Sequence, residues 1–287
     1  MNEPTQHFAD VPLLEGEGTH RIAYYEWGDK DAAPVICVHG LTRNARDFDF
    51  LAREMAATHR VIAADMAGRG ASEWLQDWQN YNYMAYMMDC LSLLEHLQLE
   101  QVKWVGTSMG GIIGMMVAAL HPGRISKLVL NDIGSFIPKA GLERIIEYVK
   151  MPVTFDTHEK AEAYLREVFA GFGLQSEAEW NHLITHSLIE RNGTWQRTYD
   201  PNILMPLKAE TDNFTKISDV DLGELWDAID IPVMLLHGET SDLLTQDTAD
   251  AMAARDHVSY HRFANIGHAP SLFNAEQVSL VADWLRQ

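Results

Sequence analysis

The stretch "VKWVGTSMGGIIGMMVAAL", residues 102–120, joins two apolar runs through a glycine-rich turn. The first run is short and predicts a buried strand, whereas the second is long and predicts a helix. At their junction, residues 106–110 read Gly-x-Ser-x-Gly around Ser108. A serine in such a sharp strand-to-helix turn projects its hydroxyl above the sheet, and larger flanking residues would collide with the strand or the helix. The stretch therefore predicts a nucleophile elbow, and Gly111 and Gly114 would let the helix approach the sheet closely.

Strand and helix signals alternate on both sides of this turn. Short, nearly continuous apolar runs predict buried strands, and longer runs with apolar residues at helical spacing predict helices. The expected strands cover residues 21–28, 34–40, 60–70, 102–108, 125–132, 231–242 and 258–268. The expected helices cover residues 48–58, 83–97, 109–122 and 275–287. This alternation predicts an α/β fold with a mostly parallel central sheet flanked by helices.

The pattern changes between residues 134 and 214, where acidic and aromatic residues mix and no convincing buried strand is seen. We interpret this segment as a helical lid, or cap, inserted after the strand at residues 125–132, taken as the sixth strand of the fold, because an insertion is simpler than a second independent domain. The core of the fold is then expected to consist of residues 1–133 and 215–287.

A serine hydroxyl is a poor nucleophile unless a base accepts its proton and a carboxylate orients that base. His268 follows the last expected strand, where α/β enzymes assemble their active sites, and is the expected base. Asp242 follows the preceding strand and is the favoured acid, because the order Ser, Asp, His then fits. Two alternatives stay open: Asp132, after the strand at residues 125–132, and less favourably Glu239.

Acyl transfer also needs donors for the negative charge that develops on the substrate oxygen. The backbone N–H groups of Met109, directly after Ser108, and of Leu41 are the expected donors. His39 is expected to support the Leu41 loop rather than act as a second base. The turn at residues 65–72 is expected to be structural.

Composition limits the function further. The chain has 287 residues, of which 22 are basic and 41 acidic, so its net charge is −19. This balance repels nucleic acid, and it repels an anionic substrate unless a basic group lies in the pocket. The first residues do not resemble a signal peptide, and no apolar run suits a membrane span. Cys37 and Cys90 lie in apolar segments and are expected to be reduced. We expect a cytoplasmic protein without membrane partners. The sequence is compatible with a homodimer.

No metal-binding or cofactor motif is evident, so neither a metal nor a cofactor is expected. His182 and His186 stand four residues apart in "WNHLITH" and could share one helical face. The sequence suggests no third ligand beside them. A surface helix is therefore the preferred interpretation.

Together, "VHGLTRN", "DMAGRGAS", "GTSMGG", "LVLND", "HGETSD" and "NIGHAP" resemble the motifs of the α/β-hydrolase superfamily. The resemblance runs from about residue 22 to the end of the chain, and the cap is its poorest match. It implies the lid-bearing subgroup, which includes carboxylesterases, C–C hydrolases of meta-cleavage products and haloperoxidase-like enzymes. Serine at the elbow excludes the haloalkane dehalogenases and epoxide hydrolases, which carry aspartate there.

The resemblance implies a serine hydrolase that cleaves small, largely apolar carboxylic esters through an acyl-enzyme, with water as the second reactant. An alternative is hydrolysis of a carbon–carbon bond in a meta-cleavage dienoate. Such enzymes commonly carry a tryptophan shortly after the histidine, which "GHAPSLF" lacks, although Arg191 or Arg197 could supply the positive charge they also use. A non-catalytic ligand receptor on the same scaffold is the alternative of another class.

Overall fold

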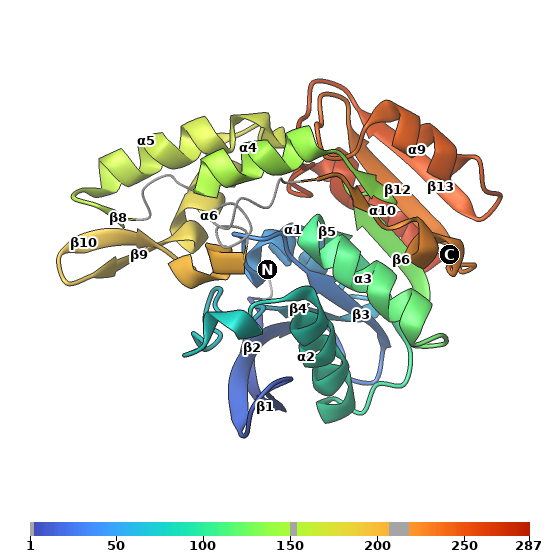
Figure 1. Ribbon diagram of the computed structural model, residues 1–287, viewed down its shortest axis with the longest axis horizontal. Helices are drawn as coiled ribbons and strands as arrows, with labels where there is room; N and C mark the ends of the chain where they lie inside the picture. Colours follow the sequence, from blue (N-terminus) through green and yellow to red (C-terminus); the bar gives the residue numbers. More distant parts are fainter. Residues whose placement is uncertain (1–2, 150–153, 207–217) are drawn as a thin grey trace.

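A computed structural model describes residues 3–149, 154–206 and 218–287. Its centre is an eight-stranded sheet with the order β1-β2-β4-β3-β5-β6-β12-β13 (Figure 1). The strand β2 is antiparallel to both of its neighbours, and the other strands run parallel. The strands are β1 (Thr5–Pro12), β2 (Thr19–Trp27), β3 (Ala33–Val38), β4 (His59–Ala64), β5 (Val102–Thr107), β6 (Ile125–Asn131), β12 (Val233–Gly238) and β13 (Val258–Phe263).

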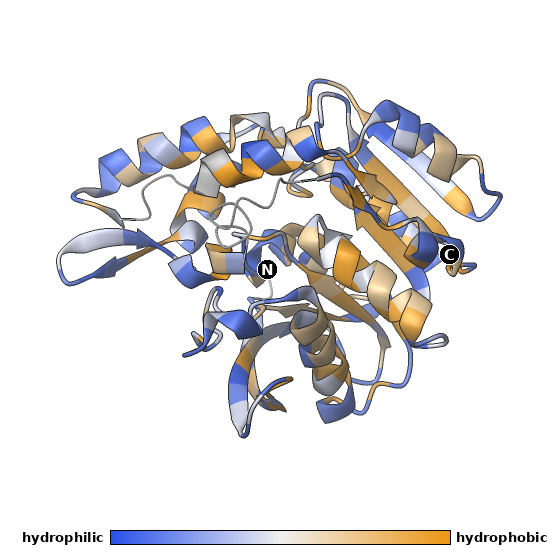
Figure 2. Cartoon of the chain, viewed as in Figure 1, coloured by the Kyte–Doolittle hydropathy of each residue, from blue (hydrophilic) through white to orange (hydrophobic). Residues whose placement is uncertain are grey.

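Helices cover both faces of this sheet, as buried parallel strands require. One apolar cluster joins the sheet to α1 (Asp49–Met55) and α10 (Ala275–Arg286). The cluster on the opposite face includes α2 (Tyr83–His96), α3 (Met109–Leu120), α8 (Gly223–Asp227) and α9 (Gln246–Ala253). Figure 2 shows the central strands as mostly hydrophobic, in contrast to the mixed colours of the outer helices. The predicted α/β fold with a mostly parallel sheet is confirmed.

The first strand, β1, was not predicted from the sequence. It pairs antiparallel with β2 at the edge of the sheet. Only alternate residues at its end, Ala9 and Val11, are buried, and Phe8 remains exposed. A half-exposed edge strand has no continuous apolar run, which is the signal that predicted the buried strands.

The segment that follows β6 lies over the carboxyl ends of the parallel strands (Figure 1). It contains the helices α4 (Lys139–Val149), α5 (His158–Val168) and α6 (Glu177–Ser187). We call the described residues 139–149 and 154–206 the cap. The predicted end of the insertion at residue 214 lies outside the described residues.

The cap is not only helical, so the expectation of a strandless segment is wrong. The strands β8 (Thr154–Phe155), β10 (Thr194–Arg197) and β9 (Leu188–Arg191) form a small sheet in that order. Asn192 and Gly193 join the last two with φ values of 53° and 76°, the backbone of a tight hairpin turn. A second pair, β7 (Phe136–Ile137) with β11 (Val220–Asp221), flanks the cap.

The described residues also form short 3-10 helices: η1 (Ala45–Phe48), η2 (Trp78–Asn80), η3 (Ala170–Phe172) and η4 (Pro201–Leu204). The cap has its own apolar cluster, which reaches Phe273 of the core. Cys37 and Cys90 are free and buried, as predicted. Among the described residues, every helix is too short or too polar to cross a lipid bilayer.

Candidate active site

Ser108 occupies the predicted strand-to-helix turn between β5 and α3. Its backbone has φ 50° and ψ −112°, a conformation that L-residues rarely adopt. A Cβ atom at Gly106 would lie 2.3 Å from the Gly110 carbonyl oxygen, and one at Gly110 would lie 1.9 Å from the Val38 carbonyl oxygen. Only glycine fits at these two positions, so the strained turn follows directly from the local sequence.

His268 lies in the loop after β13 and contacts the serine, as predicted. The distance from His268 Nε2 to Ser108 Oγ is 2.9 Å. The imidazole is mostly buried, with a side-chain exposure of 12%. At this distance the ring nitrogen can accept the hydroxyl proton directly.

Asp132 completes a chain of three hydrogen-bonded groups. It directly follows β6, has φ 59° and is fully buried. Its Oδ2 lies 2.7 Å from His268 Nδ1, and its Oδ1 accepts the backbone N–H of Gly238 at 2.7 Å. The carboxylate is therefore held from two sides and fixes the orientation of the imidazole ring.

The prediction that Asp242 orients His268 is wrong, because the structure places Asp132 there instead. Asp242 is partly exposed and accepts hydrogen bonds from Nε and Nη2 of Arg144, a residue of the cap helix α4. Glu239 is likewise engaged elsewhere, with Arg262 and the backbone N–H of Asn265. The strands β6 and β12 are neighbours in the sheet, so both aspartates follow adjacent strand ends.

The loop after β3 lies beside the elbow. A Cβ atom at Gly40 would be 3.8 Å from Ser108 Cβ, and Leu41 lines the cavity in front of the serine. Met109 is the first residue of α3, where a helix leaves its N–H groups without intrahelical acceptors. The two residues predicted to supply the oxyanion donors therefore lie beside the serine, and that role stays a prediction.

His39 supports this loop, in agreement with its expected structural role. Its Nε2 accepts the N–H of Met66 at 3.0 Å, which leaves Nδ1 to donate to the Gly40 carbonyl at 2.7 Å. The Gly40 carbonyl and the Leu41 N–H belong to one planar peptide group, so this bond also orients the Leu41 N–H. Burial lowers the pKa of His39 to about 3, which keeps the ring neutral.

The turn at residues 65–72 is structural, as expected. Asp65 accepts the N–H groups of Ala45 and Ala71. Arg69 is fully buried and donates from Nε to the Leu41 carbonyl at 2.9 Å. This turn therefore supports the Leu41 loop through the Leu41 carbonyl, in addition to the contact that His39 makes with the Gly40 carbonyl.

The buried, neutral His39 predicts that stability falls as the pH is lowered below about 6.5. An unfolded histidine takes up a proton near that pH, whereas the folded His39, with a pKa of about 3, does not. The unfolded state therefore binds more protons, and the free energy of unfolding falls by up to about 1.4 kcal/mol per pH unit from this site. Urea denaturation at several pH values between 7 and 4 measures the slope.

His39→Asn is the matched variant for this measurement. Its free energy of unfolding should change less steeply with pH, by the equivalent of about one bound proton. Burial raises the pKa of Asp65 to about 6, which acts in the opposite direction, but it does so in both proteins. Equal slopes for the two proteins would contradict the assignment.

A cavity of about 110 Å³ opens above Ser108. A cavity of this size suits a short acyl chain. Core and cap both contribute to its wall, with Phe169, Phe172 and Leu183 from the cap and Phe48 and Phe273 from the core. Among the described lining residues the arginines are Arg43 and Arg144, and neither Arg191 nor Arg197 is included.

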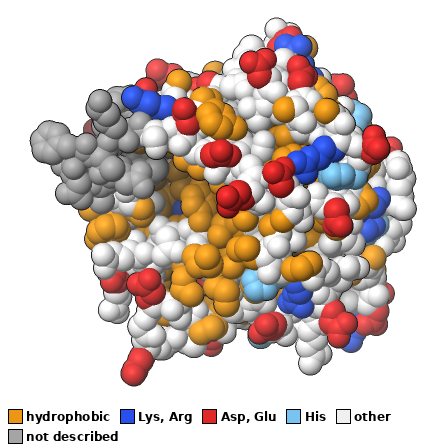
Figure 3. Space-filling view, turned by 45° about the vertical axis from the view of Figure 1, so that its right-hand side comes forward, with side chains coloured by type: hydrophobic (Ala, Val, Ile, Leu, Met, Phe, Trp, Pro, Cys, Tyr) orange, Lys and Arg blue, Asp and Glu red, His pale blue; other side chains and the backbone are white. Residues whose placement is uncertain are grey.

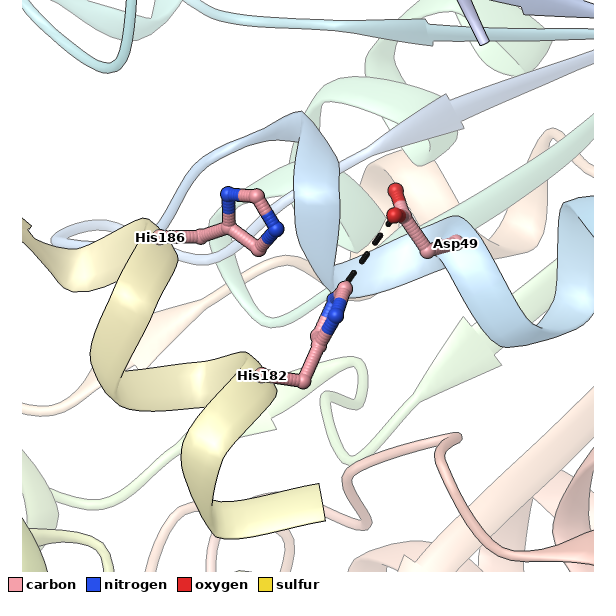
Figure 4. Close-up of side chains that lie close together, drawn as sticks. All are labelled: Asp49, His182 and His186. Carbon is pink, nitrogen blue, oxygen red and sulfur yellow. Dashed lines mark ion pairs between the residues drawn. The ribbon is translucent and has the colours of Figure 1, made fainter. Parts of the chain in front are cut away.

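Asp49, His182 and His186 form a separate cluster between α1 and α6 (Figure 4). Asp49 is the third group that the sequence did not suggest, and one ligand atom from each residue lies within 4.8 Å of the others. The Asp49 carboxylate, however, is already neutralised by Arg46 and Arg53. Nε2 of His182 lies 2.9 Å from the Arg46 carbonyl and therefore donates its proton there. The His182 bond joins the cap to the core, and the Asp49 carboxylate and His182 Nε2 are therefore already engaged within the protein.

Known proteins resemble this chain in both sequence and fold. Residues 33–275 match the family model for the alpha/beta hydrolase fold. The 3-hydroxybutyrate-oligomer hydrolase of Cupriavidus necator is 38% identical over 276 residues, which are 94% of this chain and 94% of that protein.

Two solved structures agree with this match. A putative hydrolase from Rickettsia typhi is 34% identical with a TM-score of 0.90, covering 99% of both chains. An α/β hydrolase from Novosphingobium aromaticivorans is 33% identical with a TM-score of 0.87, covering 100% of this chain and 99% of that one. Since these likenesses extend over nearly the whole length, the chain belongs to the α/β-hydrolase family of enzymes.

Proposed function

We propose that this enzyme is a serine hydrolase that cleaves small carboxylic esters through an acyl-enzyme. The observation that carries the proposal is the continuous hydrogen-bonded chain from Ser108 through His268 to Asp132. The same three groups, in the same roles, perform acyl transfer on several unrelated folds.

In the proposed mechanism Ser108 Oγ attacks the ester carbonyl while His268 Nε2 takes its proton. Asp132 holds the imidazole and stabilises its charged form. The N–H groups of Leu41 and Met109 bind the oxyanion of the tetrahedral intermediate. His268 then protonates the leaving alcohol, and water activated by the same ring releases the acid and restores the serine.

Short oligoesters of a hydroxy acid are the substrates that we propose first. The relative from Cupriavidus necator is named a 3-hydroxybutyrate-oligomer hydrolase. A four-carbon hydroxy acid is also compatible with the size of the cavity and with its mostly apolar wall.

The test is a substrate panel with the purified protein. It compares kcat/KM for 3-hydroxybutyrate dimer and trimer, p-nitrophenyl butyrate, p-nitrophenyl laurate and a meta-cleavage dienoate. We expect hydrolysis of the short esters, with much lower values for the laurate and the dienoate. Turnover of the dienoate above the esters would replace this proposal with C–C hydrolysis, and no turnover with no fluorophosphonate adduct would favour a receptor.

A further inference from the structure

A carboxylate-bearing substrate meets an electrostatic obstacle on this protein. The net charge is −19, and acidic side chains are scattered over the face shown in Figure 3. An oligoester of a hydroxy acid ends in a free carboxylate, which such a surface repels. A cation at the active-site cavity would offset that repulsion.

Arg43 lines the cavity, but its charge is already neutralised. It donates from Nε and Nη2 to both oxygens of Asp47, which also lines the cavity, at 2.9 and 2.5 Å. Its Nη1 donates to Ser187 Oγ at 2.6 Å, and the guanidinium stacks over Phe169. The side chain is only 5% exposed, so this pair is a fixed part of the wall.

Arg144 also donates from Nε and Nη2 to both oxygens of an aspartate, Asp242, but it differs from Arg43 in its exposure. It lines the cavity from the cap helix α4 and is 49% exposed. Its partner, Asp242, is not among the described lining residues, so this ion pair presents its guanidinium and not its carboxylate to the cavity.

The guanidinium of Arg144 also retains an unused edge. Nε and Nη2 donate to Asp242, whereas Nη1 makes no hydrogen bond to any residue within the described ranges. Arginine presents five N–H donors in a planar fork, so a second carboxylate can bind at the remaining edge without displacing the first.

Packing of the helix α4 against the core fixes the position of Arg144. One turn earlier on α4, a Cβ atom at Gly141 would lie 2.7 Å from the Asp242 carbonyl oxygen and 2.7 Å from Leu243 Cδ2. The helix therefore packs directly on the loop that carries Asp242. This close contact, together with the ion pair, holds the guanidinium at the cavity.

We propose that Arg144 is a specificity-determining residue that binds the free carboxylate of a short hydroxy-acid ester, with Asp242 holding the guanidinium in place. This inference rests on the proposed esterase function and adds the substrate class: anionic esters whose carboxylate lies close to the scissile bond.

The experiment compares the 3-hydroxybutyrate dimer as the free acid with the same dimer as its neutral carboxamide. The two carry different groups at one end only, a carboxylate or a neutral amide, and the loss of intact dimer is followed by chromatography. A hydrogen bond between charged groups predicts about a tenfold to hundredfold higher kcat/KM for the acid. Arg144→Ala should bring the ratio of kcat/KM for the acid to that for the amide to about one. Arg144→Lys should keep part of the preference for the acid.

Arg166→Ala is the matched control. Arg166 is another cap arginine with acidic partners, Glu162 and Glu177, and it is not among the described residues that line the cavity. This variant should keep the wild-type ratio. In the wild type, raising the salt concentration to about 0.5 M should lower the ratio, because exposed charges are screened, and this test does not depend on any variant folding.

Equal kcat/KM for acid and amide in the wild type, or equal losses for both in Arg144→Ala, would overturn the inference. The proposed esterase function would survive either result, since it requires only that both dimers or p-nitrophenyl butyrate are cleaved at Ser108. If no ester is hydrolysed, the proposed function itself fails.

Discussion

Ser108→Ala is expected to lower kcat for p-nitrophenyl butyrate by about 10⁶, the scale measured when the nucleophile of such a triad is removed. The loss is this large because alanine leaves His268 with no hydroxyl to deprotonate and prevents the acyl-enzyme from forming. The variant should fold normally, since among the described residues the Ser108 side chain forms a hydrogen bond only with His268. Initial rates at saturating substrate, together with circular dichroism, measure both outcomes.

Two controls separate this effect from a loss of structure. Ser126→Ala removes a serine hydroxyl from β6, where it contacts the Val102 carbonyl, and should leave kcat within a few-fold of wild type. A fluorophosphonate probe should label the wild type and Ser126→Ala but not Ser108→Ala. Ester hydrolysis by Ser108→Ala at a tenth of the wild-type rate or more would refute the role of this serine.

Asp132→Asn is expected to lower kcat by about 10⁴, as in triads where the acid becomes an amide. The reason is the tautomer of His268. An asparagine that turns its NH₂ group toward Nδ1 favours the ring form with the proton on Nε2, which cannot accept the Ser108 proton. The other carboxylate oxygen already accepts the Gly238 N–H, and this bond favours that orientation of the amide.

Asp242→Asn is the comparison that tests the corrected acid. Asp242 is partly exposed and bonded to Arg144, so we expect this variant to lose less than about tenfold on p-nitrophenyl butyrate. If Asp242→Asn lost about 10⁴ and Asp132→Asn remained active, the predicted triad would be restored and the geometry described above would not represent the working enzyme.

The acid was the one member of the site that chain order could not identify. Asp132 and Asp242 follow neighbouring parallel strands, and both precede His268 in sequence, so either order fits. Which side chain reaches the imidazole depends on backbone direction at the strand end. Asp132 directly follows β6 with positive φ, a conformation that aspartate tolerates better than most residues, whereas Asp242 lies four residues beyond β12.

Ser108 was predictable because a local rule fixes it, and His268 was predictable because it follows the last expected strand. The glycines around Ser108 have no room for a side chain, so the pentapeptide identifies the turn without tertiary information. The buried parallel strands were predictable for a similar reason, since each is a continuous apolar run. The cap was less predictable because its structure depends on contacts with the core and within the cap, which local sequence patterns do not show. Its strands are also only two to four residues long.

One signal in the cap could have been used. Asn192-Gly193 between two short runs is a strong hairpin pattern, because both residues tolerate positive φ. Arg144, by contrast, had no signal in the sequence. Its relation to the cavity depends on how α4 packs against the Asp242 loop.

The place of Ser108 at the start of α3 has an electrostatic consequence. The peptide dipoles of this twelve-residue helix add up to about half a positive elementary charge at its first turn, beside the serine. In the proposed mechanism the negative oxygen of the intermediate forms at that end. Part of its stabilisation therefore comes from the backbone itself, which no side-chain substitution in the triad removes. This sets a lower limit on activity, so variants of Asp132 and His268 should remain faster than the reaction in water.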